Sequence, residues 1–412
     1  MSNEFKNTKK QVIRPTISVQ DGLPFSQIRT LIQAEPTVFV RKFQDIVNEK
    51  KLSFSNIPSI RDLYAYTADI QVPMQMQDAA GITRTITTSA FPVITGTLGI
   101  AAINEAYQDV PTIGENLVTD LEDSKKVTTI VQVNTLDKDQ DEVKESEEFP
   151  EIGASEESVE IRHKKNGRKV TISAEMISEN DIVNIQEKFN ALGQIAAEWI
   201  EEQTLYRVTD HYGCGASPTE PYVYRPNGTG TALYSATANT PGTRAPSGNR
   251  IESNALVDYT DISAVRTRFA TFKNSRGKRM YVPWSEVVFL LPDAIEETML
   301  SIVNSILVPG IENQTNNFGE RGKYSISTDR IFSTPKLDDL SSSAWYAGAF
   351  KRQFVRKWKM RFEYVSLGMD TQAYLNSQIA AQYRLAWDME IGARDYVFVV
   401  QCLDGTTAPV DA

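Results

Sequence analysis

The stretch SVEIRHKKNGRKVTIS, Ser158–Ser173, decides the fold of this chain. Apolar and polar residues alternate on both sides of Asn166-Gly167, which is the pattern of a β-strand. Asn-Gly is also a preferred pair for a two-residue hairpin turn, because both turn positions need a positive φ. Counting outward from such a turn places Ile161 opposite Ile172 on one face. The stretch therefore predicts a charged β-hairpin, which has too little apolar surface to be stable without a partner surface.

The charge changes sign along this part of the chain. Eleven acidic residues lie between Asp137 and Glu160, against two lysines. The following segment contains no acid and five basic residues: Arg162, Lys164, Lys165, Arg168 and Lys169. A charge run of this kind is ordinarily a solvated loop, but this one leads directly into the predicted hairpin. We interpret residues 135–177 as one extended loop and hairpin that other surfaces complete.

A long helix is predicted directly after the hairpin, over residues 178–212. Apolar residues follow one another at three- or four-residue steps from Ile182 to Tyr206. Ser178 and Asp181 resemble a capping box, and Gly213 supplies a stop. About 30 residues at a rise of 1.5 Å make a rod of roughly 45 Å, which is far longer than the average globular helix. We interpret this helix as a spine.

The remaining segments predict an α+β protein. Residues 1–90 read as an N-terminal arm, with a small helical domain as the alternative. Residues 213–255 are rich in Gly, Pro, Ser, Thr and Asn and read as a surface insertion. A second helix and a buried strand at Glu286–Leu291 follow, and alternating residues from Phe354 onward predict long strands.

The composition excludes several classes of protein. Only two cysteines and two histidines occur, which rules out a disulfide framework and a four-cysteine or histidine-rich metal centre. The net charge of −10 argues against a protein that coats nucleic acid, but not against a container for it. No apolar run reaches the ~18 residues of a membrane span. The N-terminus has no apolar core of a signal peptide, so we expect folding in a cytoplasm.

Motifs of catalysis are missing from the sequence. It contains no phosphate-binding loop, no dinucleotide fingerprint and no nucleophile elbow. The acidic run lacks the spacing of a calcium-binding loop, and His211 near Cys214 has no further ligands close by in sequence. We therefore predict no catalytic, cofactor or metal site.

The order of the predicted elements resembles one protein family. The resemblance covers residues 90–402 and is carried by short stretches whose order and spacing match: Glu147–Glu151 (EEFPE), Ser158–Ser173 before the long helix, Val287–Asp293 (VVFLLPD), Ser333–Leu337 (STPKL), Trp345-Tyr346 and Ile391–Tyr396 (IGARDY). Together they look like the major capsid proteins of tailed bacteriophages with the Hong Kong 97 fold.

This resemblance implies a division of the chain into named parts. They are an N-terminal arm over 1–90, a first part of the peripheral domain over 91–134, an extended β-hairpin loop (E-loop) over 135–177, a peripheral segment with the spine helix over 178–275, an axial domain over 276–349, peripheral strands over 350–402 and a tail over 403–412. It also implies a structural role and no enzymatic activity.

The same resemblance implies partners and a location. Copies of the chain would form hexamers and pentamers of an icosahedral head that encloses double-stranded DNA without reading its sequence. A portal protein and scaffolding or cement proteins would be further partners, and no membrane would be involved. The expected location is the virion, after assembly in the cytoplasm of a bacterial host.

Contacts between copies are expected at the charged segments. We expect Glu145, Glu147 and Glu148 of one copy to meet basic groups of a neighbour; these groups are Arg162, Lys164, Lys165, Arg168 and Lys169. Exposed ion pairs are worth only ~0–1 kcal/mol each, so many of them would have to act together.

Alternative functions remain open at the level of sequence. An encapsulin-like bacterial nanocompartment shares the fold that the resemblance implies. An enzyme built on the β-rich C-terminal half would need convergent carboxylates in a pocket, whereas the acids here gather in one extended segment. The triangulation number, the host, cleavage of residues 1–90 and covalent cross-links cannot be predicted from these residues.

Overall fold

The computed structural model describes residues 18–19, 23–34, 39–77, 83–125, 127–131, 158–211, 222–237, 244–274, 277–306, 316–319, 322–367 and 377–405. They fall into two compact units. Unit 1 comprises Met1–Val110, Gly167–Ala197 and Phe362–Ala386, and unit 2 comprises Pro111–Asn166, Glu198–Arg361 and Trp387–Ala412. Helices and strands occur in both, which confirms the α+β prediction.

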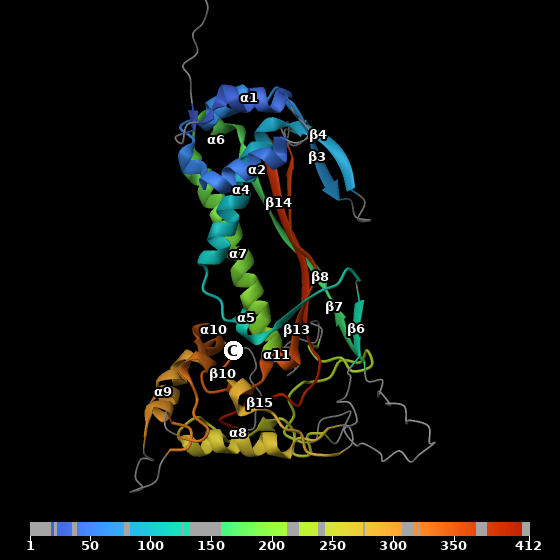
Figure 1. Ribbon diagram of the computed structural model, residues 1–412, viewed down its shortest axis with the longest axis vertical. Helices are drawn as coiled ribbons and strands as arrows, with labels where there is room; N and C mark the ends of the chain where they lie inside the picture. Colours follow the sequence, from blue (N-terminus) through green and yellow to red (C-terminus); the bar gives the residue numbers. More distant parts are fainter. Residues whose placement is uncertain are drawn as a thin grey trace, which may run out of the picture. The chain divides into compact units, whose positions relative to one another are not determined.

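Helices form the larger part of unit 1 (Figure 1). They are α1 (Phe25–Ala34), α2 (Phe39–Lys50), α3 (Ile60–Thr67), α4 (Ala90–Asp109), α6 (Ala174–Ser178) and the first part of α7 (Ile182–Val208), with a 3-10 turn at Phe54–Asn56. Their core is aromatic: the ring of Phe189 lies 5.3 Å from that of Phe54 and 5.1 Å from that of Tyr383. Three segments far apart in sequence thus share one core.

The N-terminal part of the chain differs from the predicted arm. The side chains of Phe25, Phe43 and Phe54 are buried, α1 packs on α3, and both α2 and α3 pack on α4. The described part of residues 1–90 is therefore a helical cluster, closer to the alternative of a small helical domain. The apolar residues of these helices are spaced for burial, but their short lengths weaken the signal in the sequence.

Helix α4 packs closely against α7 within unit 1. A Cβ atom on Gly193 would lie 2.4 Å from the carbonyl oxygen of Ile103, and one on Gly99 would lie 2.6 Å from the ring of Phe189. These glycines let the two helices approach. Pro92 falls in the first turn of α4, where its missing N–H costs nothing.

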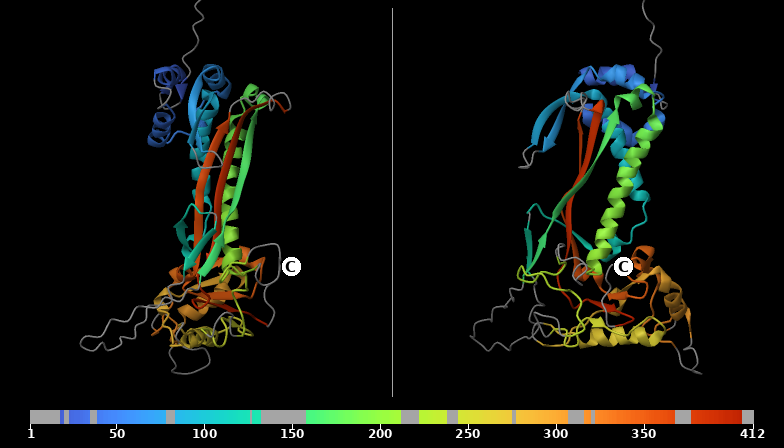
Figure 2. Two further views of the ribbon diagram at one scale, coloured as in Figure 1. Left: turned by 90° about the vertical axis from the view of Figure 1, so that its right-hand side faces the viewer. Right: turned by 180° about the vertical axis from the view of Figure 1, so that it is seen from behind.

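Two antiparallel ribbons belong to unit 1. Strand β3 (Gln71–Gln77) pairs along its whole length with β4 (Thr83–Ser89), and β1 (Ser18–Val19) pairs with β2 (Leu23–Pro24). Figure 2 shows the ribbon β3–β4 leaving the helices of this unit.

A four-stranded sheet contains the longest strands of the chain. Its order is β5 (Thr119–Glu122), β13 (Phe354–Leu367), β14 (Ile379–Ala393) and β8 (Lys164–Ser173). Strand β5 pairs in parallel with the start of β13. Strands β13 and β14 confirm the long strands predicted from Phe354 onward, but buried and exposed residues do not alternate along them: the first five residues of β13 are all buried, Lys357 included.

Unit 2 is built on a five-stranded sheet. The order is β11 (Ile331–Thr334), β10 (Val288–Pro292), β12 (Trp345–Gly348), β15 (Val399–Cys402) and β9 (Arg250–Ile251). Strand β10 is the predicted buried strand, with its last four residues fully covered. Unit 2 also contains the ribbon strands β6 (Val127–Val131) and β7 (Ser158–Arg162). Its helices are α5 (Gly114–Leu117), α8 (Tyr259–Thr271), α9 (Glu296–Asn304), α10 (Pro335–Asp338) and α11 (Phe350–Gln353). Three 3-10 turns lie at Trp284–Glu286, Asp293–Ile295 and Thr328–Arg330.

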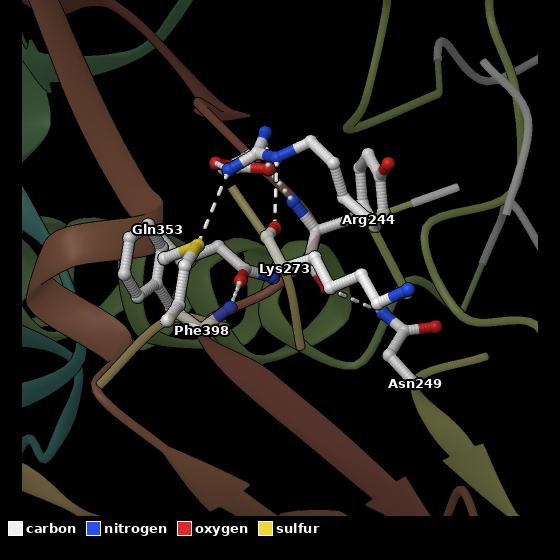
Figure 3. Close-up of polar contacts among 8 residues, drawn as sticks. Arg244, Asn249, Lys273, Gln353 and Phe398 are labelled. Atoms are coloured by element: carbon white, nitrogen blue, oxygen red, sulfur yellow. Dashed lines mark hydrogen bonds and ion pairs between the residues drawn. The ribbon is translucent and has the colours of Figure 1, made fainter. Parts of the chain in front are cut away.

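The predicted surface insertion at 213–255 is wrong for part of the segment that the structure describes, because some of its residues are buried in unit 2 and others are exposed. Arg244 makes two hydrogen bonds to the Asp395 carboxylate, at 3.0 and 2.8 Å, and both side chains are buried (Figure 3). Asn249 is fully buried and donates to the carbonyl oxygens of Leu233 and Tyr396. The buried polar side chains of this segment supply hydrogen-bond partners to irregular backbone inside unit 2. Their polarity is therefore no sign of exposure to water.

Helix α7 is shorter at both ends than the predicted spine. Ser178 ends α6, Asn180 takes a positive φ of 59°, and α7 begins at Ile182 with Asp181 accepting a hydrogen bond from the N–H of Asn184. Asp181 is therefore a cap, whereas Ser178 is not. The helix ends at Val208, before Asp210 takes a φ of 54°. Gly213, the predicted stop, lies outside the described residues.

Asp210 leads to a prediction on pH and stability. Burial raises the pKa of Asp210 to about 7, although its carboxylate accepts the N–H of Leu233 at 2.6 Å. Because the folded pKa exceeds the ordinary value of 3.8, Asp210 favours the folded state most below pH 3.8 and loses this contribution as the pH rises to about 7. We expect Asp210→Asn, which keeps the acceptor oxygen, to raise the free energy of unfolding at pH 8 by about 2 kcal/mol.

Urea unfolding of the unassembled chain at pH 4 and pH 8 measures this difference. The gain should largely vanish at pH 4, where the wild-type carboxyl is protonated. An equal gain at both pH values would contradict the assignment to the charge of Asp210.

Candidate inter-subunit surface

The acidic segment closes an antiparallel ribbon in unit 2. Strand β6 pairs with β7 in the register Val127↔Arg162 to Val131↔Ser158. Residues 132–157, named the acidic tip below, connect Val131 to Ser158 in sequence and lie outside the described residues. Glu145, Glu147 and Glu148 lie in this connection, outside the described residues.

The predicted hairpin turn at Asn166-Gly167 is wrong. Strand β8 runs through both residues, neither of which has a positive φ, and it pairs with β14 while β7 pairs with β6. Ile161 and Ile172 therefore lie in different sheets. A Cβ on Gly167 would lie 2.7 Å from the carbonyl oxygen of Leu385 on β14, so the glycine allows two backbones to approach within a sheet.

The five basic residues lie close together along the chain and are exposed. Arg162 ends β7, and the other four lie in the first half of β8. Arg162 pairs with Glu160 of its own strand at 3.0 Å. The other four basic residues are Lys164, Lys165, Arg168 and Lys169. Successive side chains of a strand point to opposite faces, so both faces of this half of β8 are basic. The structure thus groups the predicted basic residues on the surface of the described part of the chain.

Strand β8 is also an edge strand of its sheet. Lysines on an edge strand commonly prevent unwanted pairing with the strands of other molecules. The basic run therefore has two compatible roles: it blocks uncontrolled strand addition, and it offers positive charge to an acidic segment.

The base of the ribbon β6–β7 contains ionisable groups that the sequence did not reveal. His163, between β7 and β8, places Nδ1 2.6 Å from Asp388 of β14 and Nε2 3.0 Å from the carbonyl oxygen of Lys125. The buried Lys357 of β13 lies 3.7 Å from Asp123 and also donates to the Lys125 carbonyl. Hydrogen bonds from Thr128 and the Lys125 backbone lower the pKa of Asp123, while burial lowers the pKa of Lys357. No spacing in the sequence links residues 163 and 388, so only the fold identifies this cluster.

Ion pairs also connect β5 to β13 beside this cluster. Arg356 contacts Asp120, its partner in the parallel register, at 2.7 Å, and Arg361 contacts Glu122 at 2.8 Å. Both acids of β5 thus have a basic partner on β13.

Sites of other kinds are not found in the described part of the chain. Its residues contain no group of three or more His, Cys, Asp or Glu side chains able to hold a metal ion. Nor does that part include a helix with the length and apolar character needed to cross a bilayer.

Comparison with known proteins identifies the family. A family model described as phage capsid protein matches residues 156–401, more than half of the chain, and the chain therefore belongs to this family. No curated protein matches the chain.

Several solved structures are similar to the chain at low sequence identity. The capsid of cyanophage P-SCSP1u is 14% identical with a TM-score of 0.43, covering 71% of this chain and 88% of that chain. A chain of Mycobacterium phage Che8 is 11% identical with a TM-score of 0.40, covering 72% and 93%. A virus-like particle from Pyrococcus furiosus is 7% identical with a TM-score of 0.40, covering 74% and 96%.

The family defines the role of the chain. It is a major capsid protein, a structural component of the virion and not an enzyme. The resemblance to phage capsid proteins deduced from the order of sequence motifs is confirmed.

Proposed function

We propose that copies of this chain assemble as hexamers and pentamers into an icosahedral head that encloses double-stranded DNA. Assembly would take place in the cytoplasm of a bacterial host. Residues 276–349 would form the axial domain around each capsomer axis, and residues 91–134, 178–275 and 350–402 would form the peripheral domain. A portal protein and scaffolding or cement proteins would complete the particle.

The observation that carries this proposal is the placement of opposite charges at the two ends of β7. The acidic connection begins at Ser158, and the basic residues begin at Arg162 and continue along the exposed edge strand β8. This separation favours contact between the acidic tip of one copy and β8 of a neighbour. The contact is heterologous, because two different surfaces meet, and contacts of this type close into rings.

Weak individual contacts suit such an assembly. The basic groups are exposed, so each ion pair would contribute about 0–1 kcal/mol and would weaken as salt rises. Register would come from several pairs per neighbour, repeated over the shell. Such contacts can break and re-form, which allows correction of errors. The net charge of −10 would limit adhesion of the shell to the enclosed DNA.

Charge reversal tests this contact directly. We expect the double variant Glu147→Lys/Glu148→Lys to reduce the yield of particles at least about tenfold while the chain stays folded, because several weak pairs become repulsive. Adding Arg168→Glu/Lys169→Glu to the same chain should restore part of the yield. Particle yield is measured by sedimentation and electron microscopy, and folding by circular dichroism.

Glu179→Lys/Glu187→Lys serves as the control, since it makes the same change in net charge at two exposed positions outside the charged segments. It should assemble normally. Normal particle yield from the Glu147/Glu148 variant would sink the proposed contact.

A further inference from the structure

His163 occupies a junction between two sheets. It is the single residue between β7 and β8, where the chain leaves the ribbon β6–β7 and enters the four-stranded sheet. Its side chain is only 3% exposed, so its neighbours and not water decide how the ring is held.

Both ring nitrogens of His163 face an oxygen atom that accepts hydrogen bonds. Nε2 lies 3.0 Å from the carbonyl oxygen of Lys125, which can only accept, so Nε2 carries a proton. Nδ1 lies 2.6 Å from Oδ1 of Asp388. A ring protonated only on Nε2 and an ionised carboxylate would point lone pairs at each other across this distance. A second proton therefore lies between Nδ1 and Oδ1, whichever of the two atoms holds it more tightly.

We propose that His163 and Asp388 form a proton-dependent latch that fixes the base of the ribbon β6–β7, and that loss of one of the two ring protons at alkaline pH breaks one of its two hydrogen bonds and loosens the base. The latch connects three segments of the chain. His163 directly follows β7, Lys125 lies just before β6, and Asp388 belongs to β14. The existence of the latch does not depend on the proposed function, but its purpose does. If copies assemble as proposed, a fixed base would direct the acidic tip toward the neighbouring copy.

Charged groups from every strand at this base surround the latch. Lys357 of β13 donates to the same Lys125 carbonyl, and its charge acts on both Asp388 and Asp123. Arg162 and Lys164, the chain neighbours of His163, are exposed and screened by water.

Hydrogen exchange on the full chain tests the latch. Unassembled chains, separated by size-exclusion chromatography, are compared at pH 5.5 and pH 8.5, which bracket the ordinary histidine value of about 6.5. After correction for the intrinsic pH dependence of exchange, amides of 127–131 and 158–162 should exchange about tenfold faster at pH 8.5. Amides of β10 and β12 in the same unit should not change, which separates ribbon release from general unfolding.

Two variants distinguish the latch from a merely structural histidine. Asp388→Asn supplies an amide N–H that can donate to Nδ1 of the neutral ring, so its ribbon should stay protected at both pH values. His163→Gln cannot bridge both acceptors, so its ribbon should exchange fast at both. Wild-type exchange that is equal at the two pH values, or Asp388→Asn with the wild-type pH dependence, would overturn the latch. Because unassembled chains are measured, this outcome is independent of whether the proposed contact between copies exists.

Discussion

Replacing Arg244 by methionine is expected to lower the free energy of unfolding by about 3 to 5 kcal/mol, because it leaves a buried carboxylate without its partner. Arg244 and Asp395 are 8% and 9% exposed and make two hydrogen bonds. Burial raises the pKa of Asp395, and Arg244 is the main charge that opposes this rise. Without Arg244 the pKa of Asp395 should rise further, so the variant should lose most stability at neutral and alkaline pH.

The matched control for this change is Arg352→Met. Arg352 pairs with Glu286 at 2.6 Å, but the two side chains are 45% and 41% exposed, so the expected loss is below about 1 kcal/mol. Urea unfolding of the unassembled variants at pH 7 compares the two. Equal, small losses would mean that the segment around Arg244 is not part of the core of unit 2.

Phe189→Ala is expected to cost about 3 to 5 kcal/mol through the loss of a large buried ring and the cavity left behind. Phe189 is fully buried in unit 1 and contacts the rings of Phe54 and Tyr383. It also fills the space above Gly99 of α4. The N-terminal helical cluster, α7 and β14 should therefore lose stability together.

A double-mutant cycle with Phe54→Ala checks that these rings share one core. Because the rings are in contact, the double variant should lose less than the sum of the two single losses, by about 0.5 kcal/mol or more. Strictly additive losses would argue that residues near Phe54 do not pack on α7 as described. Val183→Ala, at a position 67% exposed on the same helix, is the control and should be nearly neutral.

Elements with a strong local period could be predicted from the sequence. The apolar spacing of α7 and α8 indicates helices, and the residue pattern from Phe354 onward indicates the strands β13 and β14, although both faces of these strands are partly buried. The ends of α7 could be predicted less accurately than its type. Asn180 and Asp210, in left-handed conformations at either end of α7, moved its limits inward, and non-glycine residues of this kind leave little trace in sequence.

The hairpin prediction failed for a specific reason. Asn-Gly satisfies two different needs: a turn with positive φ, and a strand position where another backbone comes close. The structure uses Gly167 for the second, against Leu385 of β14. The real ribbon, β6–β7, has a long acidic connection in place of a tight turn and therefore lacks a turn signal.

Contacts between residues far apart in the chain were beyond sequence reasoning. Arg244–Asp395 and His163–Asp388 join segments that no periodicity or spacing connects. The polar composition of 213–255 was interpreted as exposure because buried and exposed polar residues look alike in sequence. The structure places the five basic inter-subunit candidates at exposed positions, and the roles of the basic residues and of their acidic counterparts both stay predictions.

Electron microscopy of the purified full-length chain tests the central idea, that the chain is completed by copies of itself. We expect closed, angular particles of uniform size that dissociate as ionic strength rises. A chain that stays a single compact molecule at high concentration, with no particles at any salt concentration, would contradict it.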